Sequence, residues 1–402
     1  MMMDDYRLGA LLIAVGALFP TGEDSSGGQN NAAGVAEEFV SSPETAVYAS
    51  PVNNGQRLAM EEYIRSAAWT LKQAGVVEML CVIDDRGTFL QPLLEELHIQ
   101  HIFAAHTEED PVLGACRNGV EVVCNFWDAC LLYPVDRPYL RSHTVVSLLR
   151  AGVDEKRMVL RPAFRGSPGY PCLIDCGTYN TLLIRDSDDL EGILDCFNPD
   201  TLELPDSGCV KAIQTLSQYD DYWRRKQKGE RPDPFACTAI WDYCGTTSRM
   251  WPHLNMVGDI AYQTALQLQQ AGHDIDPELA QAGALLHGIA KGLPNAEWLG
   301  AQWLSGLGYP AVAKIVASSR DLPEDASDAL DERAVVYWAD KLVRHNRSCT
   351  VDERYMYELE LNADNPDRVL LILQRRNAAR SVQKRIFERL GQVESYAAQD
   401  VP

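Results

Sequence analysis

Hydrophobic residues along the chain follow two different patterns, and the change between them divides the sequence. In the first part, short continuous apolar runs alternate with longer segments of helical periodicity. The runs at Leu8–Gly16, Val76–Ile83 and Ala129–Val135 are typical of strands that are covered on both faces. After about residue 237, apolar positions recur mainly at helical spacing. We therefore predict an α/β domain followed by an all-α domain.

Strand and helix patterns alternate in the first part. Helices are predicted at Gln56–Ala74 and Phe89–Leu97, and a short strand is predicted at Ile99–Ala104. This order indicates a Rossmann-like, mostly parallel sheet with right-handed crossovers. Such sheets bind ligands beyond the carboxyl ends of their strands, and Asp136 lies at the end of the third apolar run. A stretch rich in Gly, Ser and Asn, residues 21–34, is predicted to be flexible.

Polar residues interrupt the apolar faces of the predicted helices in the second part. An N-cap at Asp276 predicts a helix that ends near His287. His253 lies near the start of a second helical pattern, and Asp340 lies in a third. Imidazole nitrogens and carboxylate oxygens are metal ligands, so these three residues are candidates for a metal site. The alternative is that the histidines are structural residues at helix junctions and that Asp340 is a capping or solvated acid.

Composition shifts mark the predicted boundaries. We expect an α/β domain over residues 1–225, a charged linker over 226–236, a helical domain over 237–395 and a flexible tail over 396–402. The helical domain includes a long basic helix, Pro366–Leu390, whose arginines we interpret as a solvated face.

Charge and cysteine usage narrow the possible functions. The chain has 402 residues and a formal net charge of -21, which argues against nucleic acid or an anionic membrane as a partner. Its 11 cysteines are scattered and form no CxxC pair, so a reduced, cytoplasmic setting fits best. The apolar run Leu8–Phe19 is too short to span a bilayer.

The second part resembles the HD-domain metal phosphohydrolases. Three segments carry the resemblance: His253, the run His287-Gly288-Ile-Ala-Lys291, and Ala-Asp340-Lys-Leu. The family has a His, a His-Asp pair and a distal Asp on separate helices. The resemblance implies a divalent metal at His253, His287 and Asp340, with Gly288 in the place of the fourth ligand. It also implies that Lys291 meets a substrate phosphate, although a cation at a helix C-terminus would complement the helix dipole in any case.

The first part resembles the molybdenum-cofactor cytidylyltransferases, which are small nucleotidyltransferases. The resemblance rests on Leu-Leu-Ile-Ala-Val-Gly16, on Tyr133-Pro-Val-Asp136-Arg-Pro, and on the loop Arg161–Pro171. It implies the nucleotidyltransferase fold, a nucleotide bound at Gly16 and Gly169, and Mg²⁺ with CTP or another nucleoside triphosphate near Asp136. A turn-forming role for Asp136 and a strand-ending role for Gly16 remain as alternatives.

The first part departs from this family at positions that carry charge. Between Arg7 and Arg57 there is no lysine, arginine or histidine, whereas the family neutralises pyrophosphate there with an Arg and a Lys. Tyr170 stands in the place of a family histidine, and Gln214 in the place of a family Asp.

Three functions therefore remain open. The first is a nucleotidyltransferase acting on a molybdopterin-like small molecule, with an HD half that hydrolyses a phosphoester. The second is a non-catalytic carrier, chaperone or regulator in the maturation of a molybdenum enzyme, in which both sites are those of a pseudoenzyme. The third is a weak metal-dependent phosphohydrolase that acts through the HD half alone.

Overall fold

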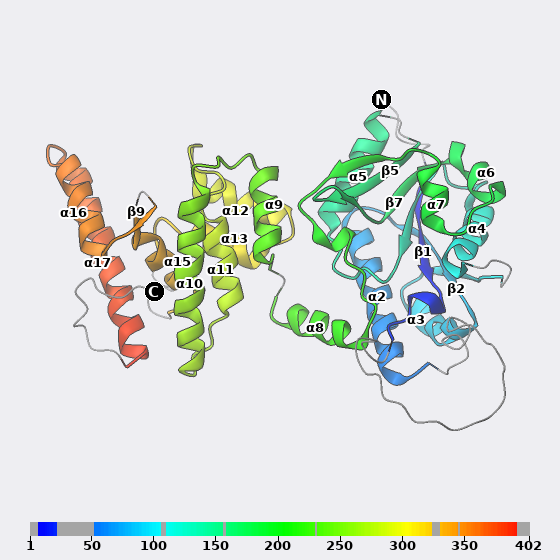
Figure 1. Cartoon of the computed structure of the whole chain (residues 1–402), viewed down its shortest axis with the longest axis horizontal. Coiled ribbons are helices and arrows are strands. Elements are labelled where there is room, and N and C mark those ends of the chain that lie inside the picture. The colour runs from blue at the N-terminus through cyan, green and yellow to red at the C-terminus, as the bar shows by residue number, and fades with distance from the viewer. Residues whose placement is uncertain are drawn as a thin grey trace, which may run out of the picture. The chain divides into compact units, whose positions relative to one another are not determined.

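The protein separates into two compact units, Met1–Lys228 and Gly229–Pro402 (Figure 1). A computed structural model describes residues 7–21, 52–105, 110–155, 158–229, 231–323, 330–344 and 346–391. The stretch 21–34, which we predicted to be flexible, lies outside the described residues except for Thr21.

An eight-stranded mixed sheet forms the centre of the first unit, in the order β3-β2-β1-β4-β7-β5-β6, with β8 beside β5. The strands are β1 Leu8–Ala14, β2 Glu78–Ile83, β3 Gln100–Phe103, β4 Ala129–Pro134, β5 Val159–Phe164, β6 Ser167–Pro168, β7 Cys172–Asp175 and β8 Asp200–Glu203. β1 pairs in parallel with both β2 and β4, whereas β7 runs antiparallel between β4 and β5. The predicted α/β fold with a parallel core is confirmed.

Helices cover both faces of this sheet, which explains the continuous apolar runs of β1 and β4. α2 (Asn54–Gln73) and α5 (Ser142–Glu155) contact each other on one face, and α4 (Pro111–Val123), α6 (Cys176–Ile184) and α7 (Leu190–Asp195) lie together on the other (Figure 1). The remaining helical segments are η1 Gly16–Leu18, η2 Asp85–Leu90, α3 Gln91–Glu96, η3 Ser207–Cys209 and α8 Leu216–Gln227.

Helix α4 was not predicted, because glycines within it lower its helix propensity. The structure gives a reason for one of them. A Cβ added at Gly119 would lie 2.3 Å from Cδ1 of Leu11, so the glycine lets α4 pack directly on β1.

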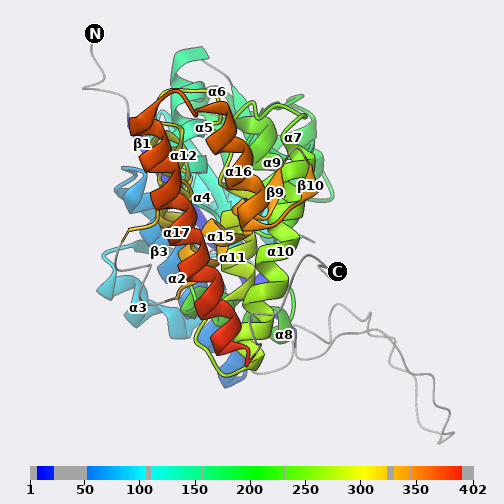
Figure 2. The same ribbon diagram turned by 90° about the vertical axis from the view of Figure 1, so that its left-hand side faces the viewer.

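Helices make up most of the second unit. They are α9 Pro234–Tyr243, α10 Trp251–Gln270, α11 Pro277–Leu286, α12 Ala296–Gly306, α13 Pro310–Ala317, α15 Glu332–Lys341, α16 Val351–Leu361 and α17 Pro366–Arg389. A short hairpin, β9 (Val343–Arg344) with β10 (Arg347–Ser348), precedes the paired helices α16 and α17 (Figure 2). The predicted helical domain is confirmed. No helix among the described residues is both long and apolar enough to cross a membrane.

Candidate functional site

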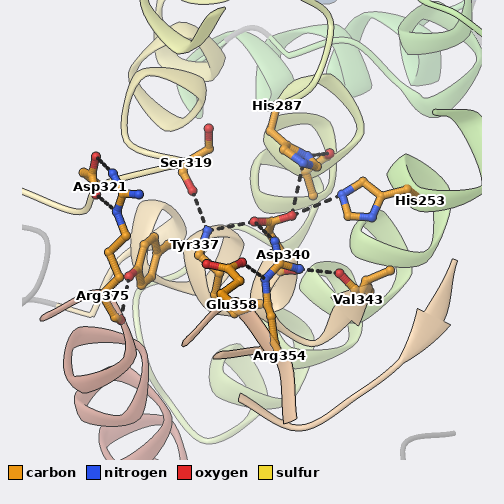
Figure 3. Close-up of polar contacts among 12 residues, drawn as sticks. His253, His287, Ser319, Asp321, Tyr337, Asp340, Val343, Arg354, Glu358 and Arg375 are labelled. Carbon is orange, nitrogen blue, oxygen red and sulfur yellow. Dashed lines mark hydrogen bonds and ion pairs between the residues drawn. The ribbon is translucent and has the colours of Figure 1, made fainter. Parts of the chain in front are cut away.

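Three helices of the second unit bring His253, His287 and Asp340 together. His253 lies in the first turn of α10, His287 caps the end of α11, and Asp340 lies in the last turn of α15. The distance from Asp340 Oδ1 to Nε2 is 3.1 Å for His253 and 3.5 Å for His287. One ligand atom from each residue lies within 4.8 Å of the other two, and both rings are directed at the carboxylate in Figure 3.

Close helix packing holds this arrangement. A Cβ added at Gly258 of α10 would lie 2.9 Å from Cδ2 of Leu285, so the glycine allows α10 and α11 to approach closely. The N-caps Asp276 and Asp331 fix where α11 and α15 begin. Buried Ala and Val side chains of α10, α11 and α15 form one core with α17. The three polar side chains are therefore set by the apolar packing around them.

His287 presents an unused nitrogen to the cluster. Its Nδ1 lies 2.6 Å from the carbonyl oxygen of Ala284, and only an Nδ1–H group can make that hydrogen bond. In the neutral ring the other nitrogen, Nε2, then carries a lone pair. Nε2 is buried and has no hydrogen-bond partner, although it faces the Asp340 carboxylate. A lone pair that faces a carboxylate oxygen is stable only with a positive charge between them, supplied by a metal ion or a proton.

Asp340 is held ionised by its neighbours. Burial opposes its ionisation, but the Lys341 ammonium, the hydrogen bond from His253 and the Arg354 guanidinium outweigh it, so its pKa lies well below the usual range. Lys341 Nζ donates to Oδ2 of Asp340 at 2.7 Å and to the carbonyl of Ser319 at 3.1 Å. Oδ2 is therefore tied to Lys341, while Oδ1 faces the histidines.

His253 is kept neutral in this site. Burial lowers its pKa below the ordinary value, and the charge of Lys291 adds to this, while the hydrogen bond with Asp340 acts in the opposite direction. A metal ligand must be neutral imidazole, so the environment of His253 favours the ligating form.

Position 288 has no room for a fourth ligand without a shift. A Cβ added at Gly288 would lie 3.0 Å from Cδ2 of Leu254 and 3.2 Å from Cε of Met250. A side chain at this position would therefore start against apolar side chains. The remaining donors are two imidazole nitrogens and one carboxylate oxygen. Two His and one carboxylate, with a position left for water, make up known catalytic zinc sites and the facial triad of non-haem iron. The three residues therefore fit one transition-metal ion.

A cavity of about 530 Å³ opens beside this cluster and reaches it through His253. Its lining comes from the start of α10, the residues after α11, the β9–β10 hairpin and α16. The lining residues are Arg249, Met250, His253, Lys291, Val343, Arg344, Asn346, Arg354, Tyr357 and Glu358. A cavity of this size accommodates a small-molecule ligand.

In the first unit, the groups predicted to hold a nucleotide make internal hydrogen bonds. The N–H of Gly16 donates to Oδ2 of Asp84 at 2.6 Å, and the N–H of Gly87 donates to Oδ1 of the same carboxylate at 3.1 Å. The N–H of Gly169 donates to the carbonyl of Pro162 at 2.7 Å. The Asp84 carboxylate therefore occupies the place that an anionic ligand of Gly16 would take.

Asp136 is buried after β4, in an ion pair with Arg137. The Arg137 guanidinium lies 4.7 Å from the ring centre of Tyr170, and Arg161 lies 4.9 Å from the same centre. The Tyr170 hydroxyl donates to Glu191, which also pairs with Arg161. Tyr170, which stands in the place of a family histidine, thus lies between two arginines and two acids in one network, in which Asp136 and Arg161 are buried and Glu191 is exposed.

The pKa of Asp136 predicts a pH effect on stability. Burial raises it from 3.8 to about 6, and the ion pair with Arg137 acts in the opposite direction. The folded protein therefore binds a proton more tightly here than the unfolded chain, and this stabilisation is lost as the pH rises through 6. At pH 7.5 the unfolding free energy is lower by at most about 3 kcal/mol than under acidic conditions, because the pKa is raised by about two units and each unit corresponds to about 1.36 kcal/mol.

Asp136→Asn removes this proton uptake. We expect the free energy of unfolding of the variant, relative to the wild type, to be higher at pH 7.5 than at pH 4. Chemical denaturation at both pH values measures it. A difference that does not change with pH would contradict the prediction.

Some groups at these sites were not found from the sequence. Arg137 and Lys341 directly follow the predicted site residues Asp136 and Asp340 in the sequence. The sequence does not show that each pairs with the preceding carboxylate, because that pairing depends on burial. Arg86 of η2 donates to the carbonyl oxygen of Gly16 and lies over the Phe19 ring, which no local pattern indicates.

Comparisons with known proteins give one family match and several structural matches of low identity. Among curated proteins none matches the chain at a significant level. Several solved structures resemble it at low identity. A nucleotidyl transferase from Methanothermobacter thermautotrophicus has 15% identity and a TM-score of 0.38, covering 55% of this chain and 99% of its own. A 4-diphosphocytidyl-2C-methyl-D-erythritol synthase from Anaerococcus prevotii has 12% identity and a TM-score of 0.37, covering 56% and 98%.

Rv0371c from Mycobacterium tuberculosis, in complex with manganese, has 10% identity and a TM-score of 0.33, covering 55% of this chain and 97% of its own. At identities of this size, nothing of the activities of these proteins transfers to the chain. The sequence comparison is more specific for the second unit: residues 250–345, which include His253, His287 and Asp340, match the HD domain family.

Proposed function

We propose that the helical unit is a metal-dependent phosphohydrolase that holds one divalent transition-metal ion on His253, His287 and Asp340. The observation that carries the proposal is the buried Nε2 of His287, which lacks a hydrogen-bond partner while its Nδ1 is bound to the Ala284 carbonyl. A backbone carbonyl on the far nitrogen is the usual way in which a ligating histidine is oriented. The HD match over residues 250–345 agrees with this assignment.

Each residue has a separate role in the proposed reaction. A bound metal would supply Lewis acidity and lower the pKa of its water. His253, His287 and Oδ1 of Asp340 would hold it, and Lys341 orients Asp340 through its other oxygen. Lys291 is exposed, lines the cavity next to His253, and binds the charge of the scissile phosphate.

Metal titration and phosphatase assays test this function. Chelator-treated protein is titrated with Zn²⁺, Mn²⁺ and Fe²⁺ by calorimetry, and hydrolysis of p-nitrophenyl phosphate is then measured with each metal. We expect one metal ion per chain and hydrolysis that depends on it. A folded protein that binds none of the three metals would disprove the proposal.

For the α/β unit, a non-catalytic role is the second candidate. The Tyr133–Pro138 motif supports descent from cytidylyltransferases of the molybdenum cofactor, and with it a molybdopterin-like ligand or a molybdenum enzyme as partner. The internal hydrogen bonds of Gly16 and Gly169, together with the ion pair of Asp136, favour a carrier, chaperone or regulator over a transferase. The N–H groups of Gly16 and Gly169 are thus not available to a triphosphate, and the sequence has no lysine between Arg7 and Arg57.

Asp84 allows this second candidate to be tested. Calorimetry of the wild type with CTP and Mg²⁺ is expected to show no binding at millimolar nucleotide.

Asp84→Ala leaves the N–H groups of Gly16 and Gly87 without their acceptor, which costs about 1–3 kcal/mol of unfolding free energy for each donor that stays buried. Asp84→Asn keeps one acceptor oxygen and is expected to lose less. Micromolar CTP affinity in the wild type would instead support a working transferase.

A further inference from the structure

The cavity beside the HD cluster is basic, although the chain as a whole is strongly acidic. Four cationic side chains and one carboxylate, Glu358, line it, whereas the chain carries a formal net charge of -21. Such a concentration of positive charge raises the local concentration of anionic ligands.

Internal pairing accounts for only part of this charge. Arg354 donates to the carbonyl oxygens of Asp340 and Val343, and its Nε lies 3.9 Å from Glu358 (Figure 3). These contacts fix Arg354 as a structural residue and neutralise Glu358. Arg249, Lys291 and Arg344 make no ion pair with any carboxylate among the described residues. Three cations of the cavity are therefore available to a ligand.

Arg344 is held in position by an aromatic side chain. Its guanidinium carbon lies 3.5 Å from the ring centre of Tyr357, which is 39% exposed. A cation over a tyrosine face is attracted by the ring and loses less entropy when it binds an anion. The stacked guanidinium keeps its N–H groups free for a planar fork of hydrogen bonds to phosphate.

The charge balance sets the class of ligand. A phosphate monoester carries a charge of about -2 near neutral pH. The proposed metal and Lys291 suffice for one such group, which leaves Arg249 and Arg344 without a counter-charge. We infer that Arg249 and Arg344 form a second phosphate subsite, so that the substrate of this cavity carries two phosphoryl groups. This inference rests on the proposed phosphohydrolase function, because it deepens the specificity of the same site.

Binding to metal-free protein tests the subsite separately from catalysis. The probes are inorganic phosphate and methylenebisphosphonate, which carries two phosphonate groups and is not hydrolysed. Chelator treatment removes the metal, so loss of hydrolytic function does not affect the result. We expect methylenebisphosphonate to bind at least about tenfold more tightly than phosphate in calorimetry at constant ionic strength.

Substitutions test which residues form the second phosphate subsite. Arg344→Gln and Arg249→Gln are each expected to weaken bisphosphonate binding about tenfold or more, with a smaller effect on phosphate. Arg347→Gln, in β10 and outside the cavity lining, is the matched control and is expected to leave both affinities unchanged. Tyr357→Leu is expected to act like Arg344→Gln, whereas Tyr357→Phe keeps the ring and the affinity.

Two results would overturn the inference. One is bisphosphonate binding that is no tighter than phosphate binding, which would mean a site for one anion only. The other is unchanged bisphosphonate affinity in folded Arg344→Gln and Arg249→Gln variants. Neither result bears on the metal cluster, which is tested by metal titration.

Discussion

Asp340→Asn is expected to lower the free energy of unfolding by about 3–5 kcal/mol, the range for breaking a buried ion pair by removal of one partner. Lys341 is 6% exposed, and its ammonium donates to Asp340 and to the Ser319 carbonyl. An asparagine at position 340 keeps the shape of the side chain but removes the charge that compensates Lys341. Chemical denaturation of metal-free protein measures the loss without any contribution from metal binding.

The double variant Asp340→Asn with Lys341→Met separates charge from packing. Methionine fills much of the lysine volume without a charge, so the double variant is expected to recover most of the lost stability. It is not expected to recover metal binding, since the ligand oxygen stays neutral. A loss of less than about 1 kcal/mol in Asp340→Asn, the value of an exposed pair, would contradict the structure, because it would mean that Lys341 is solvated.

His287→Asn is expected to weaken metal binding by more than about 100-fold, beyond the 10- to 100-fold range for loss of a residue that only supports a ligand. The asparagine amide can still donate to the Ala284 carbonyl in the way that Nδ1 does, but it has no atom at the position of Nε2. The variant therefore removes the ligand atom while keeping the local hydrogen bond. Competition with a chromogenic zinc chelator measures the affinity, and hydrolysis of p-nitrophenyl phosphate is expected to fall to background.

His273→Asn is the matched control. His273 lies in the same unit, contacts Arg389 and takes no part in the cluster. Its replacement is expected to leave metal affinity and hydrolysis unchanged. Equal metal affinity in His287→Asn and the wild type would show that the metal, if bound, is held elsewhere, and the proposed site would be wrong.

Sequence periodicity predicted most of the first five elements of the α/β unit and missed helix α4 and two later strands. The helix predicted at Gln56–Ala74 is α2, Asn54–Gln73, where Asn53 and Gln56 form a capping box. The strands β7 and β8 were not predicted. Each has only 4 residues, as has β3, which was predicted at Ile99–Ala104, and their pairing with β4 and β5 is non-local.

The candidate metal site was predicted from motif spacing, and its chemistry depended on burial. His253, His287 and Asp340 were named from three separate helical patterns, and the structure brings their ligand atoms within 4.8 Å of one another. The roles of these residues in metal binding stay a prediction. The free Nε2 of His287 and the tie between Asp340 and Lys341 depend on which atoms face each other across the helix packing.

By itself, the sequence determined the α/β and helical classes of the two units and the three residues of the candidate metal site. Local capping and helical periodicity are sufficient for the two classes, whereas the three residues were grouped by the resemblance to the HD family. Only the tertiary structure decided that the N–H of Gly16 donates to Asp84, and that Arg249, Arg344 and Tyr357 line one cavity. The physical reason is that charge pairing and cavity shape depend on contacts between residues far apart in the chain, which packing of the apolar core brings together.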